Sequence, residues 1–155
     1  MDNNFIYIKA NLIENTRLLI DNNVSIISNL SNIIRLIYES FDHVTWCGFY
    51  LSNSEYNILE LGPFQGPIAC TVIPFGKGVC GTAAKSQCSQ LVHNVHLYPG
   101  HIACSSTTNS ELVVPIIKND LCVGVIDLDS DKLSNFNEND MVLLESVAQF
   151  LSNLF

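Results

Sequence analysis

Basic residues are scarce in this chain of 155 residues. Seven Lys and Arg stand against fifteen Asp and Glu, which gives a formal net charge of −8 at pH 7. Binding to nucleic acid requires a basic surface that neutralises phosphates, and binding to an anionic membrane requires the same charge. We therefore expect neither nucleic acid nor a membrane surface as a partner.

Long apolar runs are also missing, since no stretch reaches the roughly 18 apolar residues of a membrane span. The amino terminus, MDNNFIYIKANLIEN, begins with an acidic residue and lacks the basic start and apolar stretch of a secretory signal. We expect a cytoplasmic protein, and in that compartment structural disulfides are rare. The six cysteines must then be core residues, metal ligands or redox thiols.

What is present is enough apolar sequence, 48% of the residues, to build one core. Apolar residues recur at steps of three and four over 26–38, which predicts a helix of about four turns. β-Branched and aromatic residues over 44–51, followed by 56–61 across a polar turn, predict a β-hairpin. Residues 68–73 predict a third strand.

The second half of the chain shows a similar mixture. Residues 79–85 are small and Ala-rich and predict a short helix, and an irregular loop follows over about 92–109. Residues 111–117 and 121–128 predict a tight hairpin that supplies the central strands. Asn137 can cap a final helix. This order predicts an α+β fold, with the N- and C-terminal helices on one face of a mostly antiparallel sheet.

A zinc site is one interpretation of the histidines. His93 and His96 stand three residues apart, and so do His101 and Cys104. Structural zinc sites usually contain close Cys-x-x-Cys pairs, and the sequence has none. We therefore predict no metal, and we interpret His43, His93 and His96 as surface or loop residues.

The six cysteines fall into two groups. Cys47 and Cys122 lie within apolar strands and are expected in the core, while Cys88 lies among polar residues and is expected to be exposed. The other three lie at a strand end, in a glycine-rich turn that begins a helix, and in the long loop; they are Cys70, Cys80 and Cys104. A helix N-terminus favours the thiolate, and loops allow distant thiols to meet, as redox exchange requires.

Acidic residues form a second candidate group. Asp127 and Asp129 are two apart on one predicted strand, so both side chains project from the same face of the sheet. Glu111 opens the preceding strand and could reach the same rim. The alternative is that all three are simply exposed to solvent.

Six motifs taken together resemble one known family. They are WCGFYL at 46–51, LGPFQGPIAC at 61–70, FGKGVCGTAA at 75–84, YPGHIAC at 98–104, SELVVPI at 110–116 and GVIDLDS at 124–130. The sequence resembles the free methionine-(R)-sulfoxide reductases, enzymes built on a GAF-type domain. The resemblance runs from about Trp46 to the final helix, and it implies a single GAF-type domain over residues 1–155 with about six strands.

The resemblance also implies roles for individual residues. Cys104 matches the attacking cysteine, Cys80 the cysteine that resolves the oxidised intermediate as a disulfide, and Cys70 a third cysteine that exchanges into that disulfide. Carboxylates that bind and polarise the substrate, free methionine sulfoxide, match Glu111, Asp127 and Asp129. Trp46 and Tyr50 match aromatic residues of the pocket.

The family uses no metal or other cofactor and is recycled by thioredoxin, so these are expectations here too. A homodimer is possible. Ser105 departs from the pattern, because an acidic residue is common after HIAC. A noncatalytic GAF-type sensor, which binds a small molecule or signals through a disulfide, is the alternative function, because one fold serves many functions.

Overall fold

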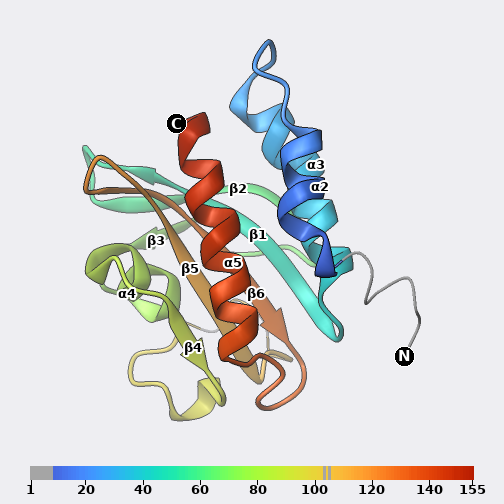
Figure 1. Cartoon of the computed structure of the whole chain (residues 1–155). Coiled ribbons are helices and arrows are strands. Elements are labelled where there is room, and N and C mark those ends of the chain that lie inside the picture. The colour runs from blue at the N-terminus through green and yellow to red at the C-terminus, as the bar shows by residue number, and fades with distance from the viewer. Residues whose placement is uncertain (1–8, 103, 105) are drawn as a thin grey trace.

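A six-stranded antiparallel sheet forms the centre of the molecule (Figure 1). The computed structural model describes residues 9–102, 104 and 106–155. Ser105, the residue that departs from the family pattern after HIAC, lies outside the described residues. The strands run in the order β3-β2-β1-β6-β5-β4. Their bounds are β1 Val44–Asn53, β2 Ile58–Gln65, β3 Val72–Pro74, β4 Gln90–Val92, β5 Ser110–Lys118 and β6 Leu121–Ser130.

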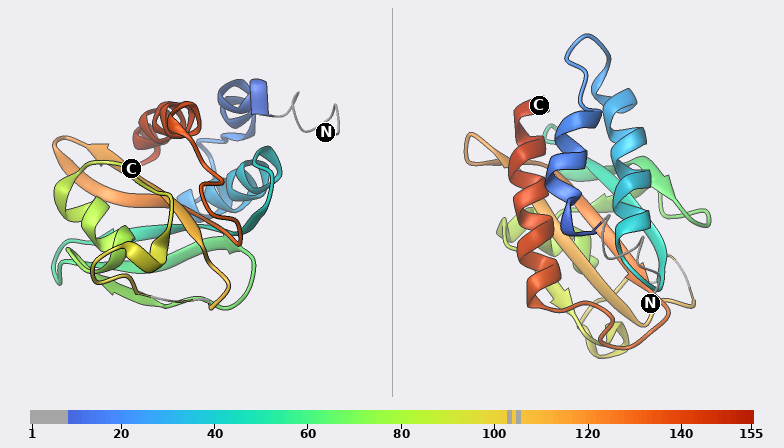
Figure 2. Two further views of the ribbon diagram at one scale, coloured as in Figure 1. Left: turned by 90° about the horizontal axis from the view of Figure 1, so that it is seen from below. Right: turned by 45° about the vertical axis from the view of Figure 1, so that its right-hand side comes forward.

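Three helices cover one face of this sheet (Figure 2). They are α2 Leu12–Leu19, α3 Ile26–Ser40 and α5 Glu138–Leu151. A fourth helix, α4 Gly78–Ser86, packs on the other face against β5 and β6. The predicted α+β class is confirmed, and so is the placement of the N- and C-terminal helices on one face.

Local sequence explains where the main elements begin and end. The Ser25 hydroxyl caps α3 by accepting from the Ser28 amide at 3.2 Å. Asn137 forms a capping box with Asp140 at the start of α5, as the sequence predicted for Asn137. The β5–β6 turn places Asn119 and Asp120 at φ 50° and 62°, the left-handed conformation that tight two-residue hairpins require.

The sheet has a separate hydrophobic core on each face. The core under α2, α3 and α5 includes five fully buried residues, Ile33, Ile37, Phe49, Leu112 and Ile126. The core under α4 is built from different residues of the same strands, among them Trp46, Tyr50, Val113 and Val125. Strand alternation is the reason, because successive side chains point to opposite faces.

Some sequence expectations were wrong in detail. The strand predicted over 68–73 is only Val72–Pro74 long, because Cys70 is drawn into a disulfide and the side chain of Ile68 is 92% exposed. The strand pair at the centre of the sheet is β1–β6, not β5–β6, because the short strand β4 alone lies beyond β5. Neither β4 nor α2 was predicted.

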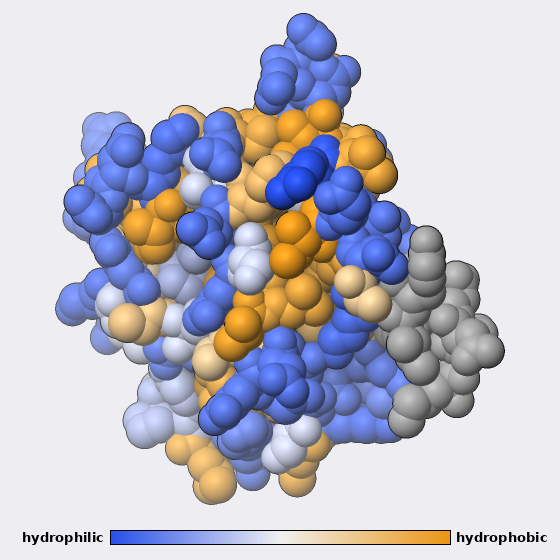
Figure 3. Space-filling view, viewed as in Figure 1, coloured by the Kyte–Doolittle hydropathy of each residue, from blue (hydrophilic) through white to orange (hydrophobic). Residues whose placement is uncertain are grey.

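The surface over α2, α3 and α5 contains both apolar and hydrophilic side chains (Figure 3). Apolar residues gather between α5 and α2, where the Arg17 guanidinium also lies 5.2 Å from the centre of the Phe150 ring. Within the described part of the chain, no helix combines the length and the apolar character needed to cross a membrane.

Candidate active site

Three buried or half-buried carboxyl groups lie together on the α4 face of the sheet. Glu111 is the second residue of β5 and stands directly opposite Asp129 of β6, and Asp127 lies two residues earlier on β6. Glu111 is 6% exposed and Asp127 is 5% exposed, and Asp129 is half-buried. The predicted position of the three side chains at one rim is therefore what the fold produces, and none of them faces open solvent.

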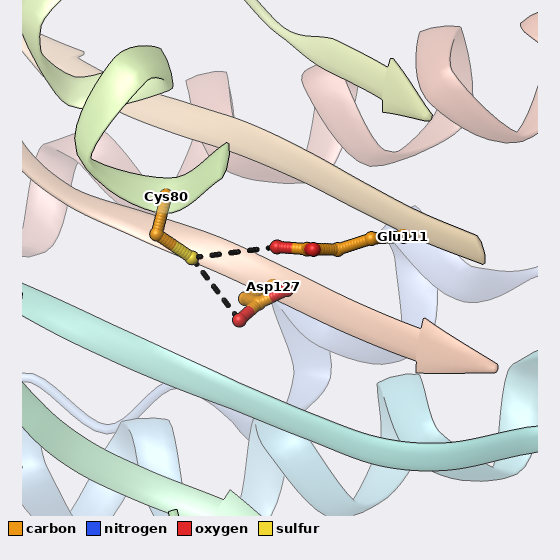
Figure 4. A group of neighbouring side chains, drawn as sticks. All are labelled: Cys80, Glu111 and Asp127. Atoms are coloured by element: carbon orange, nitrogen blue, oxygen red, sulfur yellow. Dashed lines mark hydrogen bonds between the residues drawn. The ribbon is translucent and has the colours of Figure 1, made fainter. Parts of the chain in front are cut away.

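Cys80 faces Glu111 and Asp127 from the first turn of α4 (Figure 4). Its thiol donates a hydrogen bond to Asp127 Oδ2 at 3.1 Å, and its sulfur lies 4.0 Å from Glu111 Oε1. The close approach of α4 depends on Gly81, since a Cβ there would lie 2.2 Å from the Pro74 carbonyl oxygen. The Gly81 carbonyl in turn accepts from the Gly76 amide at 2.6 Å.

Burial dominates the electrostatics of this cluster. It raises the pKa of Asp127, Glu111 and Asp129 well above the usual carboxyl values, and a neighbouring carboxylate raises each pKa further. Hydrogen bonds from Cys80 to Asp127 and from Thr108 to Asp129 act against the rise. Burial also raises the pKa of the Cys80 thiol, with Asp127 and Glu111 adding to the effect. The site therefore favours protonated carboxyl groups and a neutral thiol at Cys80.

A disulfide joins Cys70 to Cys104 across 34 residues of sequence, with the two Cα atoms 5.6 Å apart. The expected bond from Cys104 to Cys80 is therefore not the one that the structure contains, and Cys80 is a free, buried thiol. The hydrogen bond to Asp127 holds the sulfur of Cys80 against the carboxyl cluster. Cys70 instead lies in the loop after β2, whose backbone is fixed by the Tyr50 hydroxyl donating to the Cys70 carbonyl at 3.0 Å.

Aromatic side chains form one wall of the site. The Trp46 ring stacks between the rings of Tyr50 and Phe64, at centroid distances of 5.8 Å and 5.6 Å. Its indole N–H donates to the Pro67 carbonyl at 3.1 Å. Gly48 leaves room for this ring, because a Cβ there would lie 2.2 Å from the indole.

These side chains line a cavity of about 50 Å³. At roughly 10–15 Å³ for each water, that is room for a few waters in this disulfide-bonded form. Seven of the eight predicted residues line it, namely Trp46, Tyr50, Cys80, Cys104, Glu111, Asp127 and Asp129. The eighth, Cys70, is bonded to Cys104.

Among the other lining residues, two contact the acids and were not assigned to this site from the sequence. His101 Nε2 lies 3.5 Å from Glu111 Oε2, and burial lowers the pKa of His101, so the contact joins two groups that favour their neutral forms. The position of His101 in the YPGHIAC motif was a signal for it. Thr108, which bonds Asp129, had no comparable signal.

The remaining cysteines and histidines lie as the sequence suggested. Cys47 and Cys122 are buried and Cys88 is exposed. His93 and His96 are exposed, and His96 Nε2 lies 2.8 Å from Asn109 Oδ1. Over residues 9–102, 104 and 106–155, the one set of Cys, His, Asp and Glu side chains close enough to share an ion is Cys80, Glu111 and Asp127.

Comparison with known proteins agrees with this architecture. The GAF domain family model matches residues 25–154. The free methionine-R-sulfoxide reductase of Saccharomyces cerevisiae is 47% identical over 138 residues, which cover 85% of this chain and 77% of that protein. This chain belongs to the free methionine-R-sulfoxide reductase family. The Escherichia coli reductase of that name is 44% identical over 126 residues, covering 81% of this chain and 75% of the relative.

Solved structures extend the family match to three dimensions. The free methionine-R-sulfoxide reductase from Neisseria meningitidis, in complex with its substrate, superposes with a TM-score of 0.90 at 37% identity, covering all of this chain and 92% of that one. The GAF domain of an Acinetobacter phosphoenolpyruvate-protein phosphotransferase reaches a TM-score of 0.80 at only 17% identity. That second likeness shows the GAF fold alone.

Proposed function

We propose that this protein reduces free L-methionine-(R)-sulfoxide to L-methionine, as a thiol-dependent oxidoreductase made of one GAF-type domain over residues 1–155. The observation that carries the proposal is the position of the Cys70–Cys104 disulfide, because Cys104 lines the same cavity as the buried carboxyl cluster. Membership of the reductase family supports the same reaction.

Cys104 is the proposed nucleophile. Its thiolate attacks the sulfoxide sulfur, the sulfoxide oxygen takes up protons, methionine leaves, and Cys104 is left as a sulfenic acid. A second thiol then attacks the sulfenic sulfur, so that a disulfide forms and water departs. The balance is one sulfoxide and two thiols giving one thioether, one disulfide and one water.

Cys70 is the proposed resolving thiol in place of Cys80. The structure holds Cys70 bonded to Cys104, while the pKa of the Cys80 thiol is raised and the thiol donates a hydrogen bond to Asp127. A neutral thiol is a poor nucleophile, so Cys80 is less suited to resolve the intermediate. We propose instead that Cys80 donates its hydrogen bond to Asp127 during the reaction and helps to position that carboxyl group.

A protonated carboxyl group is the proposed acid. Burial is the largest cause that raises the pKa of Glu111, Asp127 and Asp129, and a neighbouring carboxylate adds to each rise, so at least one of the three favours its protonated form. A neutral acid near the sulfoxide oxygen can donate to it without repelling the Cys104 thiolate. The group is coupled, so its titration belongs to the cluster and not to one residue.

Substrate recognition follows from the same cavity. Asp129 is the most exposed of the three acids, and we propose that it pairs with the ammonium of a free amino acid, a charge that a residue within a peptide has lost. Trp46 offers an apolar wall for the substrate methyl group. We also propose recycling of the half-buried Cys70–Cys104 disulfide by thioredoxin, in the cytoplasm.

The test is to incubate the protein with each epimer of free methionine sulfoxide and dithiothreitol and to measure released methionine. We expect turnover of the R epimer alone, and we expect Cys104→Ser to lower it by at least about 10³-fold, as loss of a nucleophile does. Cys88→Ser changes an exposed cysteine outside the cavity and is the matched control. An inactive wild type would favour the sensor function.

The resolving thiol is tested by one turnover without reductant. Wild type should lose two thiols per methionine formed, and Cys70→Ser should stop at a sulfenic acid on Cys104, which a sulfenic-acid reagent traps. Cys80→Ser should still form the disulfide. Trapped sulfenic acid in Cys80→Ser but not in Cys70→Ser would return the resolving role to Cys80.

A further inference from the structure

The three side chains drawn in Figure 4 have a second chemical property beside proton donation. Cys80, Glu111 and Asp127 each present one sulfur or oxygen atom such that all three atoms lie within 4.8 Å of one another. We propose that these three residues form a binding site for a zinc ion, inside the cavity assigned to the substrate. This set differs from the histidine pairs that the sequence spacing suggested.

The distances are close to those of a metal site. With Zn–S near 2.3 Å and Zn–O near 2.0–2.2 Å, the sulfur and oxygen atoms of a tetrahedral site lie about 3.5–3.7 Å apart. The Cys80 sulfur is 3.1 Å from Asp127 Oδ2 and 4.0 Å from Glu111 Oε1. Side-chain shifts of about half an ångström would bring both distances into the range for zinc.

An oxygen without a hydrogen-bond partner points to a missing ligand. Asp127 is only 5% exposed, and its Oδ1 atom is buried without a hydrogen-bond partner among the described residues. Such an atom normally has a partner, so we infer that its environment is completed by a group that the described residues do not supply. A cation bound by the two oxygens of Asp127, or by Oδ1 after a small rotation, completes it.

The donor set favours zinc over the common alkaline-earth ions. A thiolate with carboxylates is a borderline-soft set that suits zinc, whereas magnesium and calcium prefer oxygen ligands alone. His101 Nε2 lies 3.5 Å from Glu111 Oε2 but is not within reach of all three ligand atoms, so a solvent molecule would supply the fourth ligand. Lys77 is the only lysine or arginine among the described lining residues, and its side chain is exposed, so no buried basic group opposes a cation.

Zinc at this site would compete with the substrate. The ion would occupy the carboxyl oxygens that the proposed reaction uses to protonate the sulfoxide, so a bound ion should inhibit turnover. This part of the inference rests on the proposed function. Binding of the ion does not, because the ligands are present whether or not the protein reduces methionine sulfoxide.

Cobalt binding to the disulfide-bonded protein tests the site directly, without reductant and without turnover. In that form Cys70 and Cys104 cannot bind a metal, and the free cysteines are Cys47, Cys80, Cys88 and Cys122. We expect Co²⁺ to give a thiolate-to-cobalt charge-transfer band and Zn²⁺ to displace the Co²⁺. Cys80→Ser should abolish the band, and Cys88→Ser should leave it as in wild type.

Two isosteric variants extend the test to the oxygen ligands. Asp127→Asn and Glu111→Gln should each weaken Co²⁺ binding by at least about tenfold, since changes one shell further out already reduce metal affinity by 10–100-fold. Circular dichroism checks that each variant is folded. The proposal is wrong if wild type gives no band, if the band survives in Cys80→Ser, or if both amide variants bind Co²⁺ as tightly as wild type. An inactive protein that gives the expected bands would contradict the proposed function and leave the zinc site standing.

Discussion

The two faces of the sheet are built from the same strands and differ in almost every other respect. On β5, Leu112 points toward α2, α3 and α5 and is fully buried among apolar side chains. Its neighbour Glu111 points toward α4 and is buried beside a thiol and two acids. On β6, Leu128 and Asp127 repeat this contrast. One residue of offset along the chain separates a hydrophobic core from the candidate chemical centre.

The difference shows how this fold divides stability from chemistry. The helix face joins three helices to the sheet through apolar contacts, the largest source of folding free energy. The α4 face buries Asp127, Glu111 and Cys80, whose pKa values all rise because burial disfavours their charged forms. Burying such groups costs folding free energy unless they are neutral or paired, so a cluster of them at one place indicates a function that needs them.

The largest expected effect is on the rate, from the α4 face. Glu111→Gln keeps the shape of the side chain and removes the acid, so kcat/KM should fall by about 10²–10⁴-fold, the range for loss of general acid catalysis. Its pH–rate profile and that of Asp129→Asn should both differ from wild type. The exposed Glu55→Gln is the matched control. Unchanged profiles in both site variants would rule out the carboxyl cluster as the proton source.

The next largest effect is on stability, from the helix face. Leu112→Ala removes a fully buried side chain one residue away from Glu111, and the free energy of unfolding should drop by about 2–5 kcal/mol. The rate of the folded fraction should stay near that of wild type. Urea unfolding measures the first quantity, with Val142→Ala, at a 56% exposed position of α5, as the control. If fully folded Leu112→Ala lost most of its catalytic rate, the helix face would contribute to the chemistry and the proposed division between the two faces would be wrong.

The smallest effect is a dependence of stability on pH. Because the folded pKa of Asp127 is raised, its contribution to stability is complete below the unfolded pKa of about 3.9 and is lost as the pH rises through the folded value. The free energy of unfolding of wild type should therefore decrease as the pH rises above the unfolded value, and that of Asp127→Asn should decrease less. Urea midpoints over that range measure it. Equal slopes in the two proteins would show that Asp127 is ionised in the folded state.

Much of the fold was predictable because it depends on strong local patterns. The apolar stripe of α3, the turn between β5 and β6, and the cap of α5 at Asn137 set these elements within a few residues of the prediction. Strand β4 was missed because three residues are too few to show a period. The strand predicted over 68–73 failed for a tertiary reason, since a disulfide holds the first part of the segment in a loop.

The sequence predicted residues that gather at one cavity, and it did not predict the disulfide that two of the cysteines form. Family motifs identified the cysteines, acids and aromatic residues that the structure brings around one cavity. Three cysteines allow three pairings, and sequence alone does not choose among them. The disulfide pairing depends on where the loop after β2 places Cys70. The hydrogen bond from the Tyr50 hydroxyl to the Cys70 carbonyl helps to fix that position. His101 and Thr108 contact the acids from the long loop, whose path the sequence did not specify.

Gly81 has no functional group, yet it sets how deeply the thiol of Cys80 reaches. With a methyl group there, the helix would have to retreat from the Pro74 carbonyl, which would lie 2.2 Å away, and the sulfur would be lifted from Asp127. Anyone transplanting this centre onto another scaffold would therefore need to copy a missing side chain before copying the acids.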